Sequence, residues 1–275
     1  MDTAYIDGSF AQGEAARISP QDLGFLRGYG VFEYLRTYQQ RPFLLNEHLL
    51  RLGNSAKSIG LVLPHPLSEI EAIIQKLLPK EGEATFRIVL TGGVSQDGMA
   101  PTGTNALYIF PKALVPPPAH LYQGIHAITT EARRFLPEVK TLNYLPALIA
   151  LEQARAKGAQ EAIYRNARGH LLEATASNLL VFQGDHLIAP GGSEVLCGIT
   201  RNLVLKLAAK RFSIEERPLD ESEIPSLTEA FLTSSIKEIV PLISIDGKMI
   251  GDGTVGERTR WLREQYADYT RSTFD

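Results

Sequence analysis

Residues 138–144, Glu-Val-Lys-Thr-Leu-Asn-Tyr, constrain this chain most, because they place a lysine at the junction between an extended segment and a helix. Pro137 breaks any helix before them. The next residues, 145–157, are rich in Leu, Ala and Ile and stop at Gly158, which predicts a buried helix with a glycine C-cap. Lys140 is therefore expected at the end of an element, where its amine can project into a cleft. Burial there would lower the pKa of the amine and free its lone pair for Schiff-base formation.

Glu173 is a carboxylate in a run that is otherwise apolar or made of small residues. Strands are expected at 162–164 and 171–172, joined by a polar turn at 166–169, and this hairpin carries Glu173. A buried carboxylate must be paired or hydrogen-bonded. One natural partner is the protonated ring nitrogen of a pyridine cofactor. Taken by itself, Lys140 could equally be a solvated lysine.

Three motifs follow one another along the second half of the chain: Lys140-x-x-Asn143-Tyr144, Gly169-x-x-x-Glu173-x-x-x-Ser177-Asn178 and Gly198-Ile199-Thr200-Arg201. In this order they resemble the class IV pyridoxal-phosphate transaminases, which include branched-chain and D-amino-acid aminotransferases and aminodeoxychorismate lyase. Residues 46–52 and 234–238 also fit the family pattern, so the resemblance covers nearly the whole chain.

The resemblance implies pyridoxal 5'-phosphate as cofactor and a two-domain α/β (α+β) enzyme of fold type IV. The first domain would be a small α/β domain at residues 1–113, and the second a larger cofactor-binding domain with a mixed sheet or barrel at residues 123–275. An interdomain linker is expected at residues 114–122, because the three prolines at 116–118 cannot continue a strand.

Composition agrees with an ordinary enzyme of 275 residues, long enough for two cores. A formal net charge of −3 with scattered Lys and Arg argues against a nucleic-acid partner. The single cysteine, Cys197, excludes an internal disulfide and fits a reducing compartment. No apolar run is long enough to span a bilayer and no leader is recognisable at residues 1–5, so a cytoplasmic location without membrane contact is expected. The histidines show no ligand spacing, so no metal is expected.

The remaining elements are predicted from periodicity and turn residues. In the first domain we expect a hairpin at 5–10 turning at Asp-Gly, a strand at 31–35, a helix from the N-cap Asn46 to Gly60, a helix at 67–78, and strands at 86–90 and 106–110. In the second domain we expect strands at 179–182 and 230–232, a helix at 201–210, and a closing helix around Trp261.

The family pattern assigns the phosphate group of the cofactor to several positions. Ile199 and Thr200 lie where a helix begins, so backbone N–H groups and a hydroxyl can meet an anion there. Ser234 and Ser235 follow a strand and offer hydroxyls, and Arg51 would supply full charge. The alternatives are an ordinary helix N-cap for Thr200 and a solvated helix arginine for Arg51.

The resemblance also implies roles around the cofactor ring. Lys140 would hold the cofactor covalently and then act as base and acid, while Glu173 would keep the pyridine nitrogen protonated. Tyr144 would donate a hydrogen bond to the phenolic oxygen, although it could also be a half-buried aromatic of the lysine helix. Leu196 would pack on the ring. Cys197 beside it is expected to be a small packing residue.

Substrate residues are expected at Arg27, Phe32, Tyr34, Arg36 and Arg87. Alternation along one strand puts Phe32, Tyr34 and Arg36 on one face. Together, Arg27 and Arg87 resemble the arginine pair of a less common group of D-amino-acid transaminases, and two arginines suit D-glutamate, 2-oxoglutarate, D-alanine and pyruvate. Alternatively, Arg27 faces solvent and Arg87 pairs with an acidic neighbour.

Three departures from the family pattern bear on the reaction. Branched-chain enzymes have a tyrosine where this chain has Thr85, typical D-amino-acid enzymes have an arginine at Gly92, and the lyases favour threonine at Tyr34. We therefore expect a D-amino-acid transaminase, with an L-branched-chain transaminase and an aminodeoxychorismate lyase as alternatives. The family further implies a homodimer.

Overall fold

The structure, a computed structural model, describes residues 3–274 and divides into two compact units. The first runs from the start of the described residues to Val115 and also takes in Val139–Asn143. The second comprises Pro116–Glu138 and continues from Tyr144. The break at Val115 falls within the expected linker, whereas residues 139–143 group with the first unit although we expected them in the second domain. The expected domain limits themselves stay a prediction.

The first unit is built on an antiparallel sheet of order β2-β1-β6-β5-β3-β4. Its strands are β1 (Thr3–Ile6), β2 (Ser9–Gln12), β3 (Gly30–Tyr38), β4 (Arg41–Pro42), β5 (Ala84–Thr91) and β6 (Ala106–Ala113). The expected hairpin is confirmed, because β1 and β2 join through Asp7 and Gly8, both with positive φ. The strands expected at 31–35, 86–90 and 106–110 are likewise present and longer than predicted.

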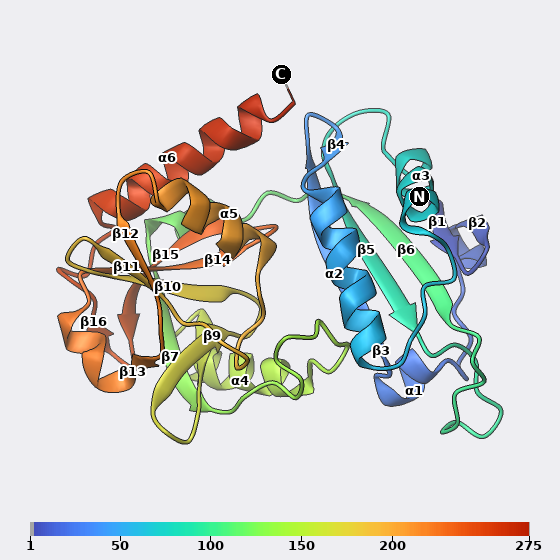
Figure 1. Cartoon of the computed structure of the whole chain (residues 1–275), viewed down its shortest axis with the longest axis horizontal. Helices are drawn as coiled ribbons and strands as arrows, with labels where there is room; N and C mark the ends of the chain where they lie inside the picture. Colours follow the sequence, from blue (N-terminus) through green and yellow to red (C-terminus); the bar gives the residue numbers. More distant parts are fainter. Residues whose placement is uncertain (1–2, 275) are drawn as a thin grey trace. The chain divides into compact units, whose positions relative to one another are not determined.

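Two helices, α2 (Leu45–Ser58) and α3 (Leu67–Lys76), cover one face of this sheet and share its apolar core (Figure 1). Leu49, Leu52 and Ala56 of α2 follow at helical spacing and are buried. The expected N-cap at Asn46 was wrong. Leu44 is the N-cap, with a left-handed backbone (φ 51°) and no side-chain hydrogen bond, so the helix begins one residue before Asn46.

A short helix, α1 (Leu23–Arg27), precedes β3 and is fixed by a buried aspartate. Asp22 accepts hydrogen bonds from the backbone N–H of Gly24 and from the hydroxyls of Thr91 and Tyr108. Burial and then the hydrogen bond to Asp22 raise the pKa of Tyr108. The helix ends at Gly28, whose left-handed φ of 65° favours glycine.

In the second unit, the strands β9, β10, β14, β15, β7 and β8 pair in a closed ring, which makes a barrel-like arrangement. They are β7 (Ile125–Glu131), β8 (Glu161–Arg165), β9 (His170–Ala174), β10 (Asn178–Gln183), β14 (Glu229–Ser234) and β15 (Glu238–Ile245). Only β7 pairs in parallel with its neighbours in this ring. Short strands extend the sheet: β11 (His186–Ala189), β12 (Ser213–Glu216), β13 (Leu219–Asp220) and β16 (Lys248–Met249).

The ring closes at one register position, where Glu173 of β9 lies opposite Asn178 of β10. Apolar side chains of the ring strands, such as Ile163, Leu179 and Val240, fill one continuous core. This pairing joins β9 to β10, and Glu173 is buried there.

Helix α4 (Leu145–Ala156) ends before Gly158, as the sequence predicted, but the expectation that it is buried was wrong. Only alanines of this helix, among them Ala147 and Ala150, are buried in the unit. Its large side chains Leu145, Leu148 and Ile149 are 66%, 59% and 51% exposed. A helix rich in apolar residues on every side does not reveal in its sequence which face packs inward.

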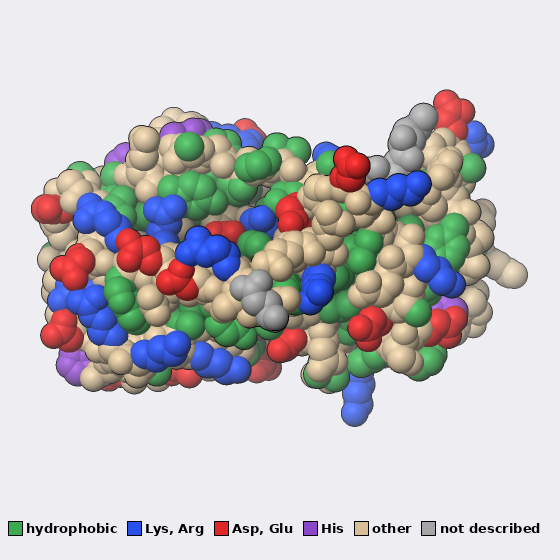
Figure 2. All heavy atoms as spheres, turned by 90° about the horizontal axis from the view of Figure 1, so that it is seen from above, with side chains coloured by type: hydrophobic (Ala, Val, Ile, Leu, Met, Phe, Trp, Pro, Cys, Tyr) green, Lys and Arg blue, Asp and Glu red, His purple; other side chains and the backbone are tan. Residues whose placement is uncertain are grey.

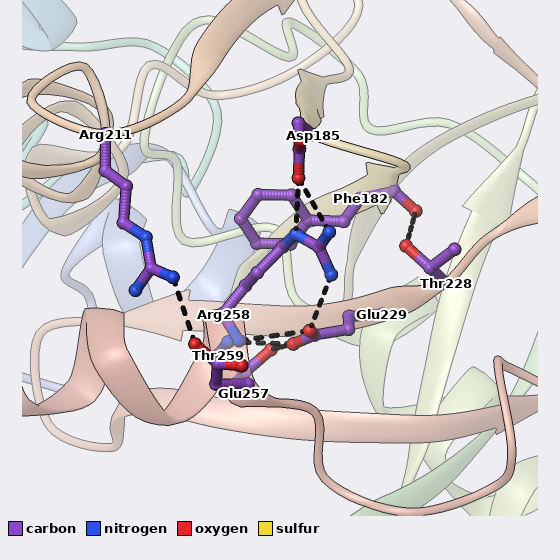
Figure 3. Close-up of polar contacts among 8 residues, drawn as sticks. All are labelled: Phe182, Asp185, Arg211, Thr228, Glu229, Glu257, Arg258 and Thr259. Atoms are coloured by element: carbon purple, nitrogen blue, oxygen red, sulfur yellow. Dashed lines mark hydrogen bonds and ion pairs between the residues drawn. The ribbon is translucent and has the colours of Figure 1, made fainter.

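Two further helices, α5 (Ile199–Ala208) and α6 (Glu257–Ser272), pack on the barrel, and a buried carboxylate anchors α6 (Figure 3). Glu229 accepts the N–H groups of Arg258 and Thr259 at 3.0 and 2.8 Å and the hydroxyl of Thr259 at 2.7 Å. It thereby satisfies the open N–H groups at the start of the helix. The approach requires Gly256, because a Cβ there would lie 1.9 Å from the carboxyl carbon of Glu229.

The remaining regular segments are the 3₁₀ turns at Gly13–Ala15, Ala119–Gln123 and Glu221–Ser226. Across residues 3–274, none of the helices combines the length and apolar character needed to cross a bilayer. Figure 2 shows Lys and Arg side chains interspersed with Asp and Glu side chains on the face that it presents.

Candidate active site

Lys140 belongs to the first unit, where its backbone is fastened to β3 and α2. The N–H of Phe32 donates to the carbonyl of Lys140 at 3.0 Å, and the N–H of Leu142 donates to the carbonyl of Gly30 at 3.0 Å. The N–H of Lys140 donates to the hydroxyl of Ser55 at 3.3 Å. Its half-buried ammonium lies 4.6 Å from the centre of the Phe32 ring. The segment that carries the lysine is thus a rigid extension of the sheet.

The alternation expected along β3 is present: Phe32, Tyr34 and Arg36 are half-buried and share one face, while the residues between them are buried. Arg87 of β5 lies directly across from Tyr34, with its guanidinium 5.1 Å from the Tyr34 ring. Arg36 stacks on the ring of Tyr38 at 4.2 Å. Each arginine is therefore oriented by an aromatic ring on the same face.

Arg51 is a partner of a buried acid rather than a solvated arginine. Its Nε and Nη2 donate to the two carboxylate oxygens of Glu33 at 2.7 and 2.8 Å, and Nδ1 of His48 lies 2.6 Å from the same carboxylate. Burial alone would raise the pKa of Glu33, but the charge and hydrogen bonds of Arg51, helped by His48, hold this pKa at about 2. Burial lowers the pKa of His48. The guanidinium of Arg51 is thus fixed by a carboxylate that stays ionised.

Asp22, Tyr34, Thr85, Arg87, Tyr108 and Lys112 are among the residues that line a cavity of about 900 Å³ in the first unit. Phe25 and Leu142 contribute apolar walls. Arg27 is not among the lining residues; it is exposed at the end of α1, and its Nε contacts the sulfur of Met99 at 3.1 Å. Within this unit the structure does not bring Arg27 and Arg87 together.

In the second unit, the expectation that the Glu173 carboxylate is hydrogen-bonded is confirmed. Glu173 accepts from the N–H of Leu196 at 3.2 Å, from the amide of Asn178 at 3.3 Å and from Arg134 at 3.4 Å. The same Asn178 amide donates to the carbonyl of Leu196 at 2.8 Å. These contacts hold both Glu173 and the Leu196 backbone in place.

The expected phosphate donors are at the start of α5 and at the end of β14. Gly198 is the N-cap of α5, without a side-chain cap, so Ile199 and Thr200 form the first turn, and Thr200 is buried. Ser234 ends β14 and Ser235 follows it, both half-buried. A helix start without a capping side chain leaves N–H groups available to an anion.

Tyr144 and Cys197 complete the predicted positions. Tyr144 is half-buried and is the N-cap of α4. Cys197 is exposed, with its sulfur in contact with the side-chain amide of Asn202, so the interpretation as a packing residue was wrong.

Three residues that matter to this geometry were missed from the sequence: Glu33, His48 and Arg134. Glu33 alternates in phase with the buried Val31 and Leu35, so it is a charge on the core face of its strand. A charge at such a position needs a partner, which could have directed attention to Arg51. No local pattern in the sequence marks Arg134.

The chain is similar in sequence to known proteins along most of its length. The sequence model of the family Amino-transferase class IV matches residues 30–245. A Methanocaldococcus jannaschii protein provisionally described as a branched-chain-amino-acid aminotransferase is 36% identical, over 96% of this chain and 95% of its own. A Staphylococcus epidermidis D-alanine aminotransferase is 31% identical, over 99% of both chains.

The fold is also similar to solved structures. The branched-chain aminotransferase of the archaeon Thermoproteus uzoniensis superimposes with a TM-score of 0.89 at 26% identity, covering 98% of this chain and 94% of that one. A second branched-chain amino acid aminotransferase, solved with pyridoxamine 5'-phosphate, gives a TM-score of 0.90 at 25% identity with the same coverage of 98% and 94%. A match over most of the chain, relatives above 30% identity along its whole length and a common fold lead to one assignment. The chain belongs to the class IV aminotransferases, enzymes of fold type IV that use pyridoxal 5'-phosphate.

Proposed function

We propose that this aminotransferase exchanges the amino group between a D-amino acid, such as D-glutamate or D-alanine, and a 2-oxo acid such as 2-oxoglutarate or pyruvate. The observation that carries the proposal is Arg87. It lines a cavity of the first unit in the middle of a strand, and it has no carboxylate partner among residues 3–274. A guanidinium in such a cavity is suited to a substrate carboxylate. The D-alanine aminotransferase relative supports the same class of substrate.

The residues present fit the cofactor chemically. Glu173 is a buried, hydrogen-bonded carboxylate, as a protonated ring nitrogen requires. The uncapped start of α5 offers N–H groups to a phosphate, and Asn178 links this start to Glu173. A Cβ on Gly198 would lie 1.9 Å from Oδ1 of Asn178, so the backbone approaches that side chain closely. Lys140 supplies the primary amine.

The roles of the cofactor residues follow from their chemistry. The bound cofactor supplies an electron sink for the negative charge that develops at the substrate Cα. Nζ of Lys140 would hold the cofactor, and once released the same amine would serve as the base and acid that moves the proton at the substrate Cα. Glu173 would hold the proton on the ring nitrogen, Tyr144 would donate to the phenolic oxygen, and Leu196 would contribute an apolar contact to the ring.

We assign the phosphate to Arg51, Ile199, Thr200, Ser234 and Ser235. The ion pair with Glu33 fixes the guanidinium of Arg51 in one orientation, which lowers the entropy lost on binding an anion. The N–H groups in the first turn of α5 and the serine hydroxyls are hydrogen-bond donors, which suit phosphate oxygens.

Substrate binding is assigned to Arg87, Phe32, Tyr34 and Arg36 on one face of the sheet, with Arg27 as a second guanidinium. Arg27 is exposed and does not line the cavity of its own unit, so we propose that it acts in the site of a second copy. The apolar face of Leu145, Leu148 and Ile149 on α4 supports a homodimer, because such exposed patches mark interfaces.

The L-branched-chain transaminase remains a second candidate. It is favoured by the M. jannaschii relative and by the apolar part of the cavity wall, including Phe25, Val89 and Phe110. Under this hypothesis Arg87 would bind the distal carboxylate of L-glutamate.

A single half-reaction distinguishes the two. Holoenzyme is mixed separately with D-glutamate, D-alanine and L-leucine, and loss of the absorbance of the enzyme-bound pyridoxal form is recorded. Rapid loss with the D-amino acids and little with L-leucine supports the proposal. Rapid loss with L-leucine alone refutes it and favours the branched-chain hypothesis.

Replacing Arg87 tests its role directly. Arg87→Ala should raise KM for dicarboxylic substrates far more than for D-alanine, because a charge-assisted contact to the distal carboxylate is worth about 1.5–3 kcal/mol. Initial rates over a range of each substrate give the two KM values. Equal increases for both would contradict a role at the distal carboxylate.

A further inference from the structure

The face of the first sheet that is turned away from α2 and α3 carries side chains in three rows. Register across β3, β5 and β6 gives the first row as Phe32, Val89 and Tyr108, the second as Tyr34, Arg87 and Phe110, and the third as Arg36, Thr85 and Lys112. Directly opposed residues of neighbouring strands point to the same side, so each row is a line of adjacent side chains. Lys140, beside Phe32, lies at the first row.

Charge among the residues that line the cavity is polarised. Asp22 is the only acid that lines the cavity among the described residues, and it lies at the first row, where Tyr108 and Thr91 donate to it. Both lining cations, Arg87 and Lys112, belong to the second and third rows. Neither forms an ion pair with the residues that the structure describes. An anionic group entering the cavity is therefore attracted to the end away from Asp22.

Arg87 and Lys112 are close enough to bind one anion together. Lys112 lies directly opposite Thr85, which is two residues from Arg87 on β5, so the two cations are diagonal neighbours. Such neighbours have Cα atoms about 7–8 Å apart, within reach of long side chains. Thr85 lies beside both with a small side chain. Its hydroxyl accepts from the Tyr34 hydroxyl and donates to the Lys112 carbonyl, both at 3.4 Å, and such long contacts are weak enough to be exchanged for a carboxylate. A carboxylate needs several donors from different directions, and this corner supplies them.

We propose that Lys112 is a specificity residue that, with Arg87 and the Thr85 hydroxyl, binds the distal carboxylate of a dicarboxylic amino acid or 2-oxo acid. The inference rests on the proposed transaminase function but not on which enantiomer reacts. According to this proposal, Lys112 and Thr85 of the third row bind glutamate and 2-oxoglutarate but make no contact with alanine or pyruvate. A monocarboxylic substrate has no second carboxylate to contact Lys112. Removing the charge of Lys112 should therefore leave the reaction of such a substrate unchanged.

The test compares Lys112→Met, which keeps an unbranched apolar stem without the charge, with Lys112→Arg. In holoenzyme, Lys112→Met should lower kcat/KM for glutamate by roughly tenfold or more, the range for a hydrogen bond to a charged group, and leave alanine within about twofold. Lys112→Arg should retain most of the glutamate activity. Lys57→Met, on an exposed position of α2, is the matched control and should change neither substrate.

Both enantiomers of each amino acid are assayed, and the ratio of glutamate to alanine is taken for the enantiomer that reacts. Reaction with L-amino acids alone would refute the D-preference and still test Lys112. Calorimetric titration with glutarate, a dicarboxylate without an amino group, gives a readout that does not need turnover. Weaker glutarate binding to Lys112→Met than to the control supports the proposal. Equal loss for glutamate and alanine, or unchanged glutarate binding, would overturn it.

Discussion

The buried pair of Glu33 and Arg51 makes a quantitative prediction about stability. The pKa of Glu33 is held at about 2, against an ordinary value of 4.5. At about 1.4 kcal/mol for each pKa unit, this difference corresponds to roughly 3 kcal/mol of folding stability at neutral pH. The carboxylate has no exposed surface, so solvent does not screen this interaction appreciably. Loss of one partner from a buried pair costs a similar amount, about 3–5 kcal/mol.

Glu33→Gln is the matching perturbation, because glutamine has the shape of protonated glutamic acid and cannot ionise. We expect it to lower the free energy of unfolding by about 3 kcal/mol at pH 7. A lowered pKa stabilises the fold above the unfolded value of 4.5, and this contribution is lost as the pH falls towards 2. The difference between wild type and Glu33→Gln should therefore shrink once the pH drops below 4.5.

Urea unfolding followed by far-ultraviolet circular dichroism, at a series of pH values from 7 downwards, measures this difference. Glu47→Gln, an exposed residue of the same helix as Arg51, is the control and should stay within about 0.5 kcal/mol of wild type. A loss below about 1 kcal/mol at pH 7, or a loss that does not change with pH, would show that the pair with Arg51 does not stabilise the fold as argued. Cofactor affinity of the same variant reports whether Glu33 orients Arg51 for the phosphate.

Two further substitutions test the site and the fold. Lys140→Ala should lower turnover by roughly a thousandfold or more and abolish the absorbance of covalently bound cofactor, because no other amine is proposed to act at the substrate Cα; retained transamination would overturn the assignment. Gly256→Ala should destabilise the protein by about 1–3 kcal/mol, since its Cβ displaces the Glu229 carboxylate from the start of α6. Gly53→Ala, where a Cβ meets only Leu63 at 3.6 Å, should be neutral or stabilising, so equal losses for both glycines would refute the steric explanation.

The sequence analysis predicted four of the six strands of the barrel ring and missed β7 and β15. Strand β15, Glu238–Ile245, is interrupted by Pro241, and a proline argues against an interior strand. The structure accommodates it because pairing with β7 begins only at Leu242, so Pro241 has a register partner in β14 alone. Which strands pair with β15, and where the pairing begins, is set by the tertiary fold and leaves no local signal in the sequence.

In the candidate site too, local motifs were predictable from the sequence and contacts between distant segments were not. Motifs and the resemblance they carry led us to predict roles for Lys140, Glu173 and the residues around the start of α5, which stay predictions. The hydrogen bonds of Glu173 were expected from the cost of burying a charge and are present. Other residues of the site come from segments that are distant in the sequence. Arg134 reaches Glu173 from the loop after β7, and Lys112 joins the row of Arg36 through strand register; the sequence displays neither arrangement.

The segment Val139–Asn143 also determines how this protein can be made and divided. Because it pairs with β3 and buries Val139 in the core of the first unit, a fragment that stops at Val115 would lack part of that core. During synthesis, the first unit therefore remains incomplete until residue 143 has left the ribosome. A single crossover at the prolines would take residues 139–143, with Lys140, from one relative and the β3 strand that they pair with from the other.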